Sequence, residues 1–208
     1  MDLAARIISV VFHPLLMATY LVLIFINFFP IAVFPLSTTS FRGFGLLIFI
    51  STFVFPVLNI LFFKLFGSIQ SLNMPTREER VIPFLFIAVL YGVITYLFYS
   101  KFRVGLSDSI FKILIIINML VVASSLITFF YKVSVHSLGI WGLIGILLPF
   151  NRMTENMELL YPTLILIVVA GLVMSARLQL QAHRPREILV GAVSGFGIGF
   201  IATILLYQ

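Results

Sequence analysis

The chain has 208 residues, of which 62% are hydrophobic and 10% are charged, with a formal net charge of +6. A soluble domain carries roughly a quarter charged residues, so this composition excludes an ordinary soluble domain and predicts an integral membrane protein. The absence of cysteine excludes disulfide and thiol chemistry. The basic residues lie mostly at the ends of apolar segments, a pattern typical of membrane topology and not of nucleic-acid binding.

Apolar blocks long enough to cross a bilayer, which takes about 20 residues per helix, recur along the whole sequence. They lack the two-residue alternation of a transmembrane β-barrel. The expected fold is therefore all-α, one integral-membrane bundle over residues 1–208 with six to seven spans, and the N-terminal block is expected to remain as the first of them. The expected spans cover residues 7–34, 43–63, 82–99, 111–131, 133–150, 159–176 and 187–207.

Three junctions between these spans gather basic or histidine residues: 73–83, 131–139 and 176–187. They follow the second, fourth and sixth expected spans. Because each pair of spans returns the chain to the face on which it began, all three junctions are expected on one face of the membrane. A single Lys or Arg at such a place can serve only to reach the headgroups, but a cluster of ionisable groups more often marks a functional site.

The third junction, "ARLQLQAHRPRE", places His183 four residues before Glu187. On a helix these two side chains share a face, and Pro185 is compatible with the first helical turn, so a helix is expected to begin near His183. Free amides at that position favour an anion such as phosphate. A carboxylate on one ring nitrogen would fix the tautomer and leave the other nitrogen able to attack. The alternative is an interfacial pair that only caps the last helix.

The second junction contains Lys132, Ser134 and His136 within five residues. A second histidine beside an anion could act as a general acid and protonate a leaving oxygen. Ser134 could donate a hydrogen bond to a phosphate oxygen, and Lys132 could supply positive charge. The alternative is a helix start with Ser134 as its cap.

The first junction places Arg77 and Arg80 one helical turn apart, beside Glu78 and Glu79. The planar guanidinium fork of arginine matches two phosphate oxygens. A set of surface ion pairs explains the same spacing equally well.

Two features lie within the spans. Gly191, Gly195 and Gly199 recur at intervals of four in the last span, and such a stripe of small residues lets a neighbouring helix approach closely. His13 precedes Pro14 in the first span. This pair predicts a proline kink with the histidine bonded to a freed carbonyl, with a position on the wall of a phosphate cavity as the alternative.

Together the junctions resemble the three signatures of the type 2 phosphatidic acid phosphatase superfamily. The order Arg177-x5-His183-x3-Glu187 resembles that family's S-R-x5-H-x3-D, and Ser134-x-His136 resembles its P-S-G-H. Arg80 is a partial match to the first signature, K-x6-R-P, and the resemblance covers about residues 77–199. The chain departs from the pattern at Ala176, Val133, Val135 and Glu187, where the family has Ser, Pro, Gly and Asp.

The resemblance implies a metal-independent phosphatase without a cofactor that cleaves a lipid phosphate through a phosphohistidine. Its substrate would be phosphatidic acid, phosphatidylglycerophosphate or a polyprenyl diphosphate. His183 would be the nucleophile, Glu187 would orient it, and His136 would be the general acid. The phosphate would be held by Arg177, Arg80, Arg77, Lys132 and Ser134. Two alternatives stay open: a membrane protein of the same fold that binds or transports an anion without hydrolysis, and a catalytically silent structural member.

Charge counts leave the membrane orientation open. The junction face has eight Lys and Arg residues against five on the other, and four of the eight have a proposed phosphate role. Without those four, the positive-inside rule gives no preference. The resemblance implies a site on the non-cytosolic face of a bacterial inner membrane. The sequence does not determine an oligomeric state.

Overall fold

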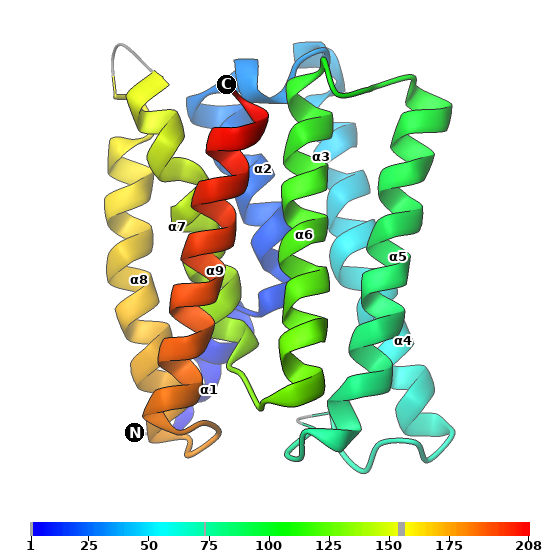
Figure 1. Cartoon of the computed structure of the whole chain (residues 1–208), viewed down its shortest axis with the longest axis vertical. Helices are drawn as coiled ribbons and strands as arrows, with labels where there is room; N and C mark the ends of the chain where they lie inside the picture. The colour runs from blue at the N-terminus through cyan, green and yellow to red at the C-terminus, as the bar shows by residue number, and fades with distance from the viewer. Residues whose placement is uncertain (1, 73, 154–156) are drawn as a thin grey trace.

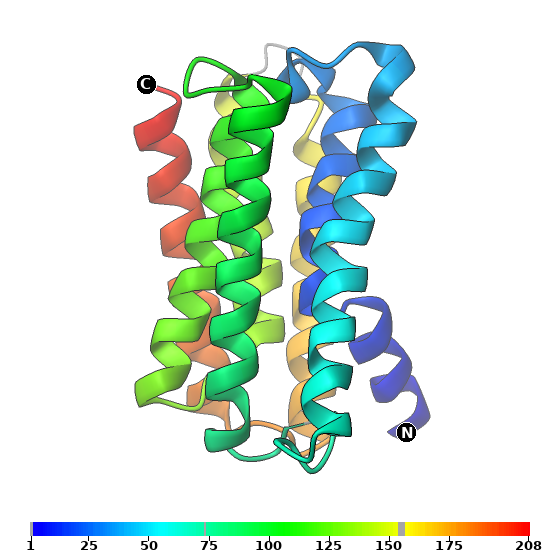
Figure 2. The ribbon, with the colours of Figure 1, turned by 90° about the vertical axis from the view of Figure 1, so that its right-hand side faces the viewer.

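The computed structural model describes residues 2–72, 74–153 and 157–208, and within these ranges the chain is a bundle of helices without a strand. The long helices run side by side along one axis, as Figure 1 and the perpendicular view of Figure 2 show. The expected all-α bundle is confirmed. Residue 73, the first of the junction 73–83, lies outside the described residues.

The helices and short turns follow the chain in this order: α1 (Asp2–Val11), η1 (Pro14–Leu16), α2 (Met17–Phe28), η2 (Pro30–Val33), η3 (Thr38–Ser40), α3 (Phe41–Phe49), η4 (Ile50–Val54), α4 (Phe55–Leu65), α5 (Glu78–Phe102), α6 (Ser109–Phe130), α7 (Val135–Met153), α8 (Leu160–Gln179) and α9 (Pro185–Leu206).

Each predicted span corresponds to a helical segment. Within the described residues, six segments have the length and apolar composition to cross a membrane: Asp2–Phe28, Phe41–Leu65, α5, α6, α8 and α9. The helix α7 covers the remaining predicted span, 133–150, and is not among the six. It carries polar residues at both ends, and most of its side chains are buried against the other helices. The chain is therefore an integral membrane bundle with α7 as its inner helix.

The first two spans are less regular than expected. The first is interrupted between α1 and η1, where His13 has extended backbone angles (φ −64°, ψ 137°) before Pro14. Proline disfavours helical geometry in the residue that precedes it, which accounts for the break. The α2 helix then ends at Phe28, before Pro30 and six residues short of the expected end. The second span contains a π-helical turn, η4, directly before α4, in which Pro56 is the second residue. The nitrogen of proline carries no hydrogen, so it cannot donate to the preceding turn.

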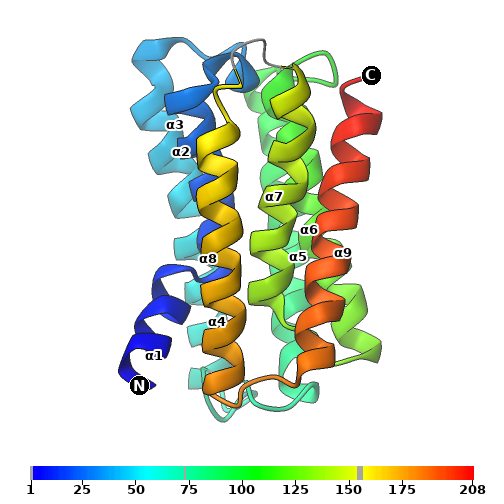
Figure 3. The same cartoon turned by 90° about the vertical axis from the view of Figure 1, so that its left-hand side faces the viewer.

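The three charged junctions lie at one end of the bundle. Figure 1 and Figure 3 show the loops between α4 and α5, between α6 and α7, and between α8 and α9 at the end that also holds the N-terminus. The C-terminus lies at the opposite end. The structure thus confirms that the three junctions lie together at one end of the bundle, as expected for junctions that share a face.

The closest helix packing joins α7 to α9 and depends on the predicted glycine stripe. A Cβ atom at Gly191 would lie 2.5 Å from the carbonyl oxygen of Ser134, and one at Gly199 would lie 2.5 Å from that of Gly142. A Cβ at Gly195 would overlap the carbonyl of Leu138. The two backbones are thus in direct contact along the stripe. This contact sets the start of α7 beside the start of α9, which is where the second and third junctions meet.

Candidate functional site

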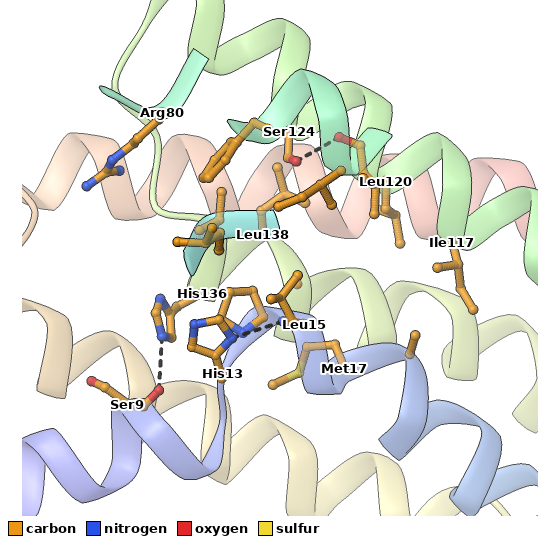
Figure 4. Close-up of a pocket in the computed structure, with 18 of the residues that line it drawn as sticks. Ser9, His13, Leu15, Met17, Arg80, Ile117, Leu120, Ser124, His136 and Leu138 are labelled. Atoms are coloured by element: carbon orange, nitrogen blue, oxygen red, sulfur yellow. Dashed lines mark hydrogen bonds between the residues drawn. The ribbon is translucent and has the colours of Figure 1, made fainter. Parts of the chain in front are cut away.

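A cavity of about 250 Å³ opens between the helices at the junction end. Side chains from all three charged junctions line it, as do residues of α1 and η1. Figure 4 shows that the cavity has a polar end and an apolar end. The polar end holds Ser9, His13, His136 and Arg80, and apolar side chains of α6 lie toward the other end. The lining includes His136, His183, Arg80, Arg177, His13 and Ser9. The junctions therefore meet around one space.

His183 and Glu187 form a buried pair at the entry to α9. Nδ1 of His183 lies 2.7 Å from Oε2 of Glu187, and the two side chains are 1% and 11% exposed. The α9 helix begins at Pro185, with Arg184 as its N-cap and Glu187 in its first turn. An ionised carboxylate only accepts hydrogen bonds, so Nδ1 of His183 donates and its Nε2 keeps a free lone pair. The spacing predicted this pairing, and the structure contains it.

The environment of His183 favours the neutral ring. Burial lowers the pKa of His183 to about 4, and the guanidinium charges of Arg80 and Arg177 act in the same direction. The carboxylate of Glu187 opposes both effects, because it stabilises the imidazolium form. At neutral pH the ring is therefore uncharged, which is the state in which a histidine can act as a nucleophile.

His136 lies in the first turn of α7 and is held by the N-terminal helix. Its Nε2 lies 3.0 Å from the carbonyl oxygen of Ser9. A carbonyl only accepts hydrogen bonds, so Nε2 carries the proton in this contact and Nδ1 remains able to exchange one. His136 is buried, and it lines the same cavity as His183.

His13 is a third imidazole on the cavity wall. Its ring centroid lies 5.6 Å from that of His136, with the ring planes 76° apart. Nδ1 of His13 accepts a hydrogen bond of 3.3 Å from the amide of Leu15, which caps η1. The expected bond to a freed carbonyl is wrong, because the break exposes an unpaired amide instead. The residue caps the turn and lines the cavity at the same time.

Two arginines bring positive charge to the cavity. Nε of Arg80 donates to the carbonyl of Met74 (2.7 Å) and Nη1 to that of Val133 (3.4 Å). Nη1 of Arg177 donates to Oγ of Ser9 at 3.3 Å, while its Nε is buried without a partner. Within the described part of the chain, neither guanidinium forms an ion pair. The cavity therefore offers cationic donors to an anion.

Three predicted phosphate ligands lie elsewhere. Arg77 pairs with Glu78 at 3.2 Å and donates to the carbonyl oxygens that end α6. Oγ of Ser134 accepts from the amide and the hydroxyl of Ser137, at 3.4 Å and 3.1 Å, so it caps α7. Lys132 is half-buried and does not belong to the cavity lining. Their contacts with a phosphate stay predictions.

Sequence reasoning missed Ser9. Its carbonyl accepts from His136 and its hydroxyl accepts from Arg177, so one residue of α1 positions two groups of the site. A signal was present: Ser9 stands four residues before His13 in an otherwise apolar segment, and residues at that spacing share a helix face. The break at His13 lets the chain turn while both residues still face the cavity.

The arrangement combines a free imidazole nitrogen, a second imidazole with an exchangeable proton, and two cations. These are the components of nucleophilic attack on phosphorus, protonation of a leaving group and stabilisation of an anion. Within the described ranges, no three His, Cys, Asp or Glu side chains form a group that could hold a metal ion. No family model matches the chain, and neither the curated proteins nor the solved structures contain a match to it.

Proposed function

We propose that this protein is a membrane phosphatase that releases phosphate from a lipid phosphate through a phosphohistidine at His183. The substrate class includes phosphatidic acid, phosphatidylglycerophosphate and polyprenyl diphosphates. The proposal is supported most by one observation: His183, His136 and the guanidinium groups of two arginines without carboxylate partners all line the same cavity, and Glu187 is bonded to His183 beside it. A cluster that served only to anchor helices at the headgroups would have no need to converge in this way.

In the first step, Nε2 of His183 attacks phosphorus and the bond from phosphorus to the leaving oxygen breaks. The phosphoryl oxygens would be held by the guanidinium groups of Arg80 and Arg177. Fixed positive charge and positioning supply most of the catalysis in phosphoryl transfer. The negative charge of the bound phosphate stabilises the imidazolium form of His136, which carries a second proton on Nδ1 besides the one that Nε2 donates to Ser9. This Nδ1 proton passes to the leaving oxygen, so the lipid alcohol departs neutral. Glu187 stabilises the positive charge that develops on the His183 ring.

In the second step, a water molecule attacks the phosphohistidine. His136 now takes a proton from this water through Nδ1, and the bond between phosphorus and Nε2 of His183 breaks. Inorganic phosphate leaves, and both histidines return to their starting protonation states. The carbonyl of Ser9 keeps the His136 ring in place throughout, because it accepts from Nε2–H in the neutral and in the charged ring.

The test is phosphate release by the purified protein in lipid nanodiscs, with a chelator present and a panel of the three lipid classes as substrates. His183→Ala should lower the rate by about 10³-fold or more, because it removes the nucleophile. Arg186→Ala is the matched control: Arg186 is an exposed residue of the same helix entry, and the rate should stay within about twofold of wild type, as surface changes usually do. Equal rates in wild type and His183→Ala would remove the enzyme proposal.

The intermediate offers a second, independent test. Rapid quenching under alkaline conditions, in which phosphohistidine persists, should yield a protein heavier by one phosphoryl group. The modified peptide should contain His183. A phosphoryl group on another residue, or none during active turnover, would contradict the proposed chemistry.

A non-hydrolytic anion binder or transporter is the second candidate. The buried Nε of Arg177, which has no hydrogen-bond partner, favours this candidate, because a bound anion would satisfy that donor whether or not the anion is then cleaved. Phosphate uptake into proteoliposomes without any lipid phosphate cleavage would support this candidate. Cleavage that depends on His183, without uptake, would support the phosphatase.

We propose further that the site faces the non-cytosolic side of a bacterial inner membrane, in line with the family resemblance. The chain has no cysteine, so single cysteines can report on topology without background. Gln181→Cys, in the exposed loop beside His183, should react with a membrane-impermeant maleimide in intact spheroplasts. Labelling only after lysis would place the site on the cytosolic face.

A further inference from the structure

The cavity continues from the charged groups into the interior of the bundle. Its inner wall is formed by α5, α6 and α7, where it includes Ile87, Tyr91, Ile117 and Ile146, and residues of α2 and α4 complete it. Tyr91 lies eleven residues beyond Arg80 on α5, which corresponds to about 16 Å along a helix. The inner part is thus a pocket inside the protein and not a patch on the surface that faces lipid.

The inner pocket presents an apolar surface to any occupant. Its two hydroxyl-bearing side chains are bonded to main-chain carbonyls, Tyr91 to Thr52 (2.8 Å) and Ser124 to Val121 (2.8 Å). Among the described residues, the rest of this inner wall is aliphatic or aromatic. Each hydroxyl thus donates its only proton to the main chain, so neither has a donor left for a phosphate oxygen. A hydrocarbon chain is the occupant that such a wall favours.

We propose that this inner pocket binds the single hydrocarbon chain of the substrate while its phosphate lies between Arg80, Arg177 and His183. The inference rests on the proposed function and narrows its substrate to single-chain phosphates, such as isoprenyl or alkyl phosphates. Continuity supports it, because the same cavity is lined by the charged groups at its mouth and by Ile117 and Ile146 deeper in. A tail lying outside among the membrane lipids would leave this apolar space without a role.

The size of the cavity limits the length of chain that it can accept. A cavity of about 150 Å³ is known to bind benzene, so one of about 250 Å³, part of which the phosphate occupies, accommodates at most roughly ten carbon atoms. Affinity should therefore rise with chain length up to about this number and then level off, because each buried methylene is worth roughly fourfold in binding. The carbon atoms of a longer chain that exceed this number must lie outside the pocket.

The experiment compares wild type with Ile117→Trp in nanodiscs, with n-alkyl phosphates from ethyl to dodecyl as substrates. Ile117 is buried on the inner wall, and the larger ring fills the space a chain would use. Partitioning of longer chains into the bilayer affects both proteins equally. The readout is therefore the kcat/KM of wild type divided by that of Ile117→Trp. We expect this ratio to rise at least tenfold between ethyl and decyl phosphate. A ratio that is constant with chain length would overturn the proposal.

A matched control and a second variant guard against misfolding. Leu126→Trp places the same ring on the same helix at a lipid-facing position that is 59% exposed, and its ratio to wild type should not change with chain length. Ile87→Trp fills the pocket from α5, on the other side of the proposed chain. It should show the same length dependence as Ile117→Trp. A length dependence with Leu126→Trp as well would also count against the pocket.

Binding of n-alkyl phosphonates, which cannot be hydrolysed, separates this inference from the proposed function. If the ratio of wild-type affinity to Ile117→Trp affinity rises with chain length, the chain pocket is supported even without turnover. If all lipid phosphates remain uncleaved, the phosphatase proposal fails alone. If cleavage depends on His183 but the ratio of the two affinities is constant with chain length, the pocket fails and the phosphatase is retained.

Discussion

The main-chain amide of Ser134 donates a hydrogen bond of 3.1 Å to the carbonyl oxygen of Glu187. This bond joins the start of α7 directly to the first turn of α9. It places His136, two residues after Ser134, at the same cavity as the His183–Glu187 pair. The glycines of α9 permit this approach, because any Cβ along the stripe would meet the backbone of α7.

Gly195→Ala should destabilise the protein. The new Cβ would overlap the carbonyl of Leu138, and overpacking of this kind costs about 1–3 kcal/mol. Gly197→Ala on the same helix is the matched control, because nothing lies within 4 Å of its Cβ position. Thermal unfolding followed by size exclusion should show a lower midpoint for the first variant and an equal or higher one for the second. Equal midpoints would show that α7 can move away at little cost.

The carboxylate of Glu187 should matter through its charge. In Glu187→Gln the side chain can still accept from Nδ1 of His183 but no longer stabilises the charged ring, so we expect kcat to fall by about 10²–10⁴-fold, as at other carboxylate–histidine pairs. Glu187→Asp keeps the charge on a shorter side chain and should retain more activity. Steady-state rates with a lipid phosphate decide this. Similar rates for both variants would mean that Glu187 has a structural role only.

Arg177 should be needed for phosphate binding. Arg177→Lys keeps a charge but loses the planar fork, which a point charge does not replace. We expect kcat/KM to fall by about 10²-fold, comparable to the loss of one charged donor to a transition state. Arg184→Ala, which alters an exposed arginine at the entry to α9, should have little effect. Equal losses in the two variants would point to a general effect of surface charge.

His136 should matter only when the leaving group needs a proton. His136→Gln should cleave alkyl phosphates about 10²–10⁴-fold more slowly, the usual contribution of general acid catalysis. A p-nitrophenyl phosphate, whose leaving oxygen is stable without a proton, should be cleaved at a much less affected rate. The ratio of the two rates is the measurement. An equal loss for both substrates would exclude the acid role and favour a role in binding.

His183 should titrate far below the ordinary histidine range. Its folded pKa of about 4 lies below the ordinary value of 6.5, so the folded protein keeps the ring neutral where an unfolded chain takes up a proton. The stability that this residue contributes is therefore complete above pH 6.5 and is lost as the pH falls toward 4. Ring NMR signals, assigned with His183→Gln, report this pKa directly. A midpoint near 6.5 would show that solvent reaches the ring.

The sequence was sufficient to predict those features that depend on composition and local spacing. Long apolar blocks predicted the helical bundle, and counting spans placed the three junctions at one end, as the structure confirms. The four-residue spacing of His183 and Glu187 predicted their contact. In each case the relevant interaction lies within one segment or follows from the number of bilayer crossings.

Features that depend on contacts between distant segments were not predictable in this way. Arg77 and Arg80 share a spacing that suits one helix face, yet Arg77 turns to the carbonyls that end α6 while Arg80 is buried at the cavity. The role of Ser9 depends on a residue more than a hundred positions away. Only the tertiary structure determines which of several basic side chains reaches the cavity and which one is bonded elsewhere.

Ser9 lies far outside the stretch of about residues 77–199 in which the family-like signatures occur. A shortened protein that began after α4 would retain every one of those signatures. It would lack the carbonyl of Ser9 that holds the His136 ring and the hydroxyl of Ser9 that accepts from Arg177. The amino-terminal helix is thus as much a part of the candidate site as the segments that carry the recognisable residues.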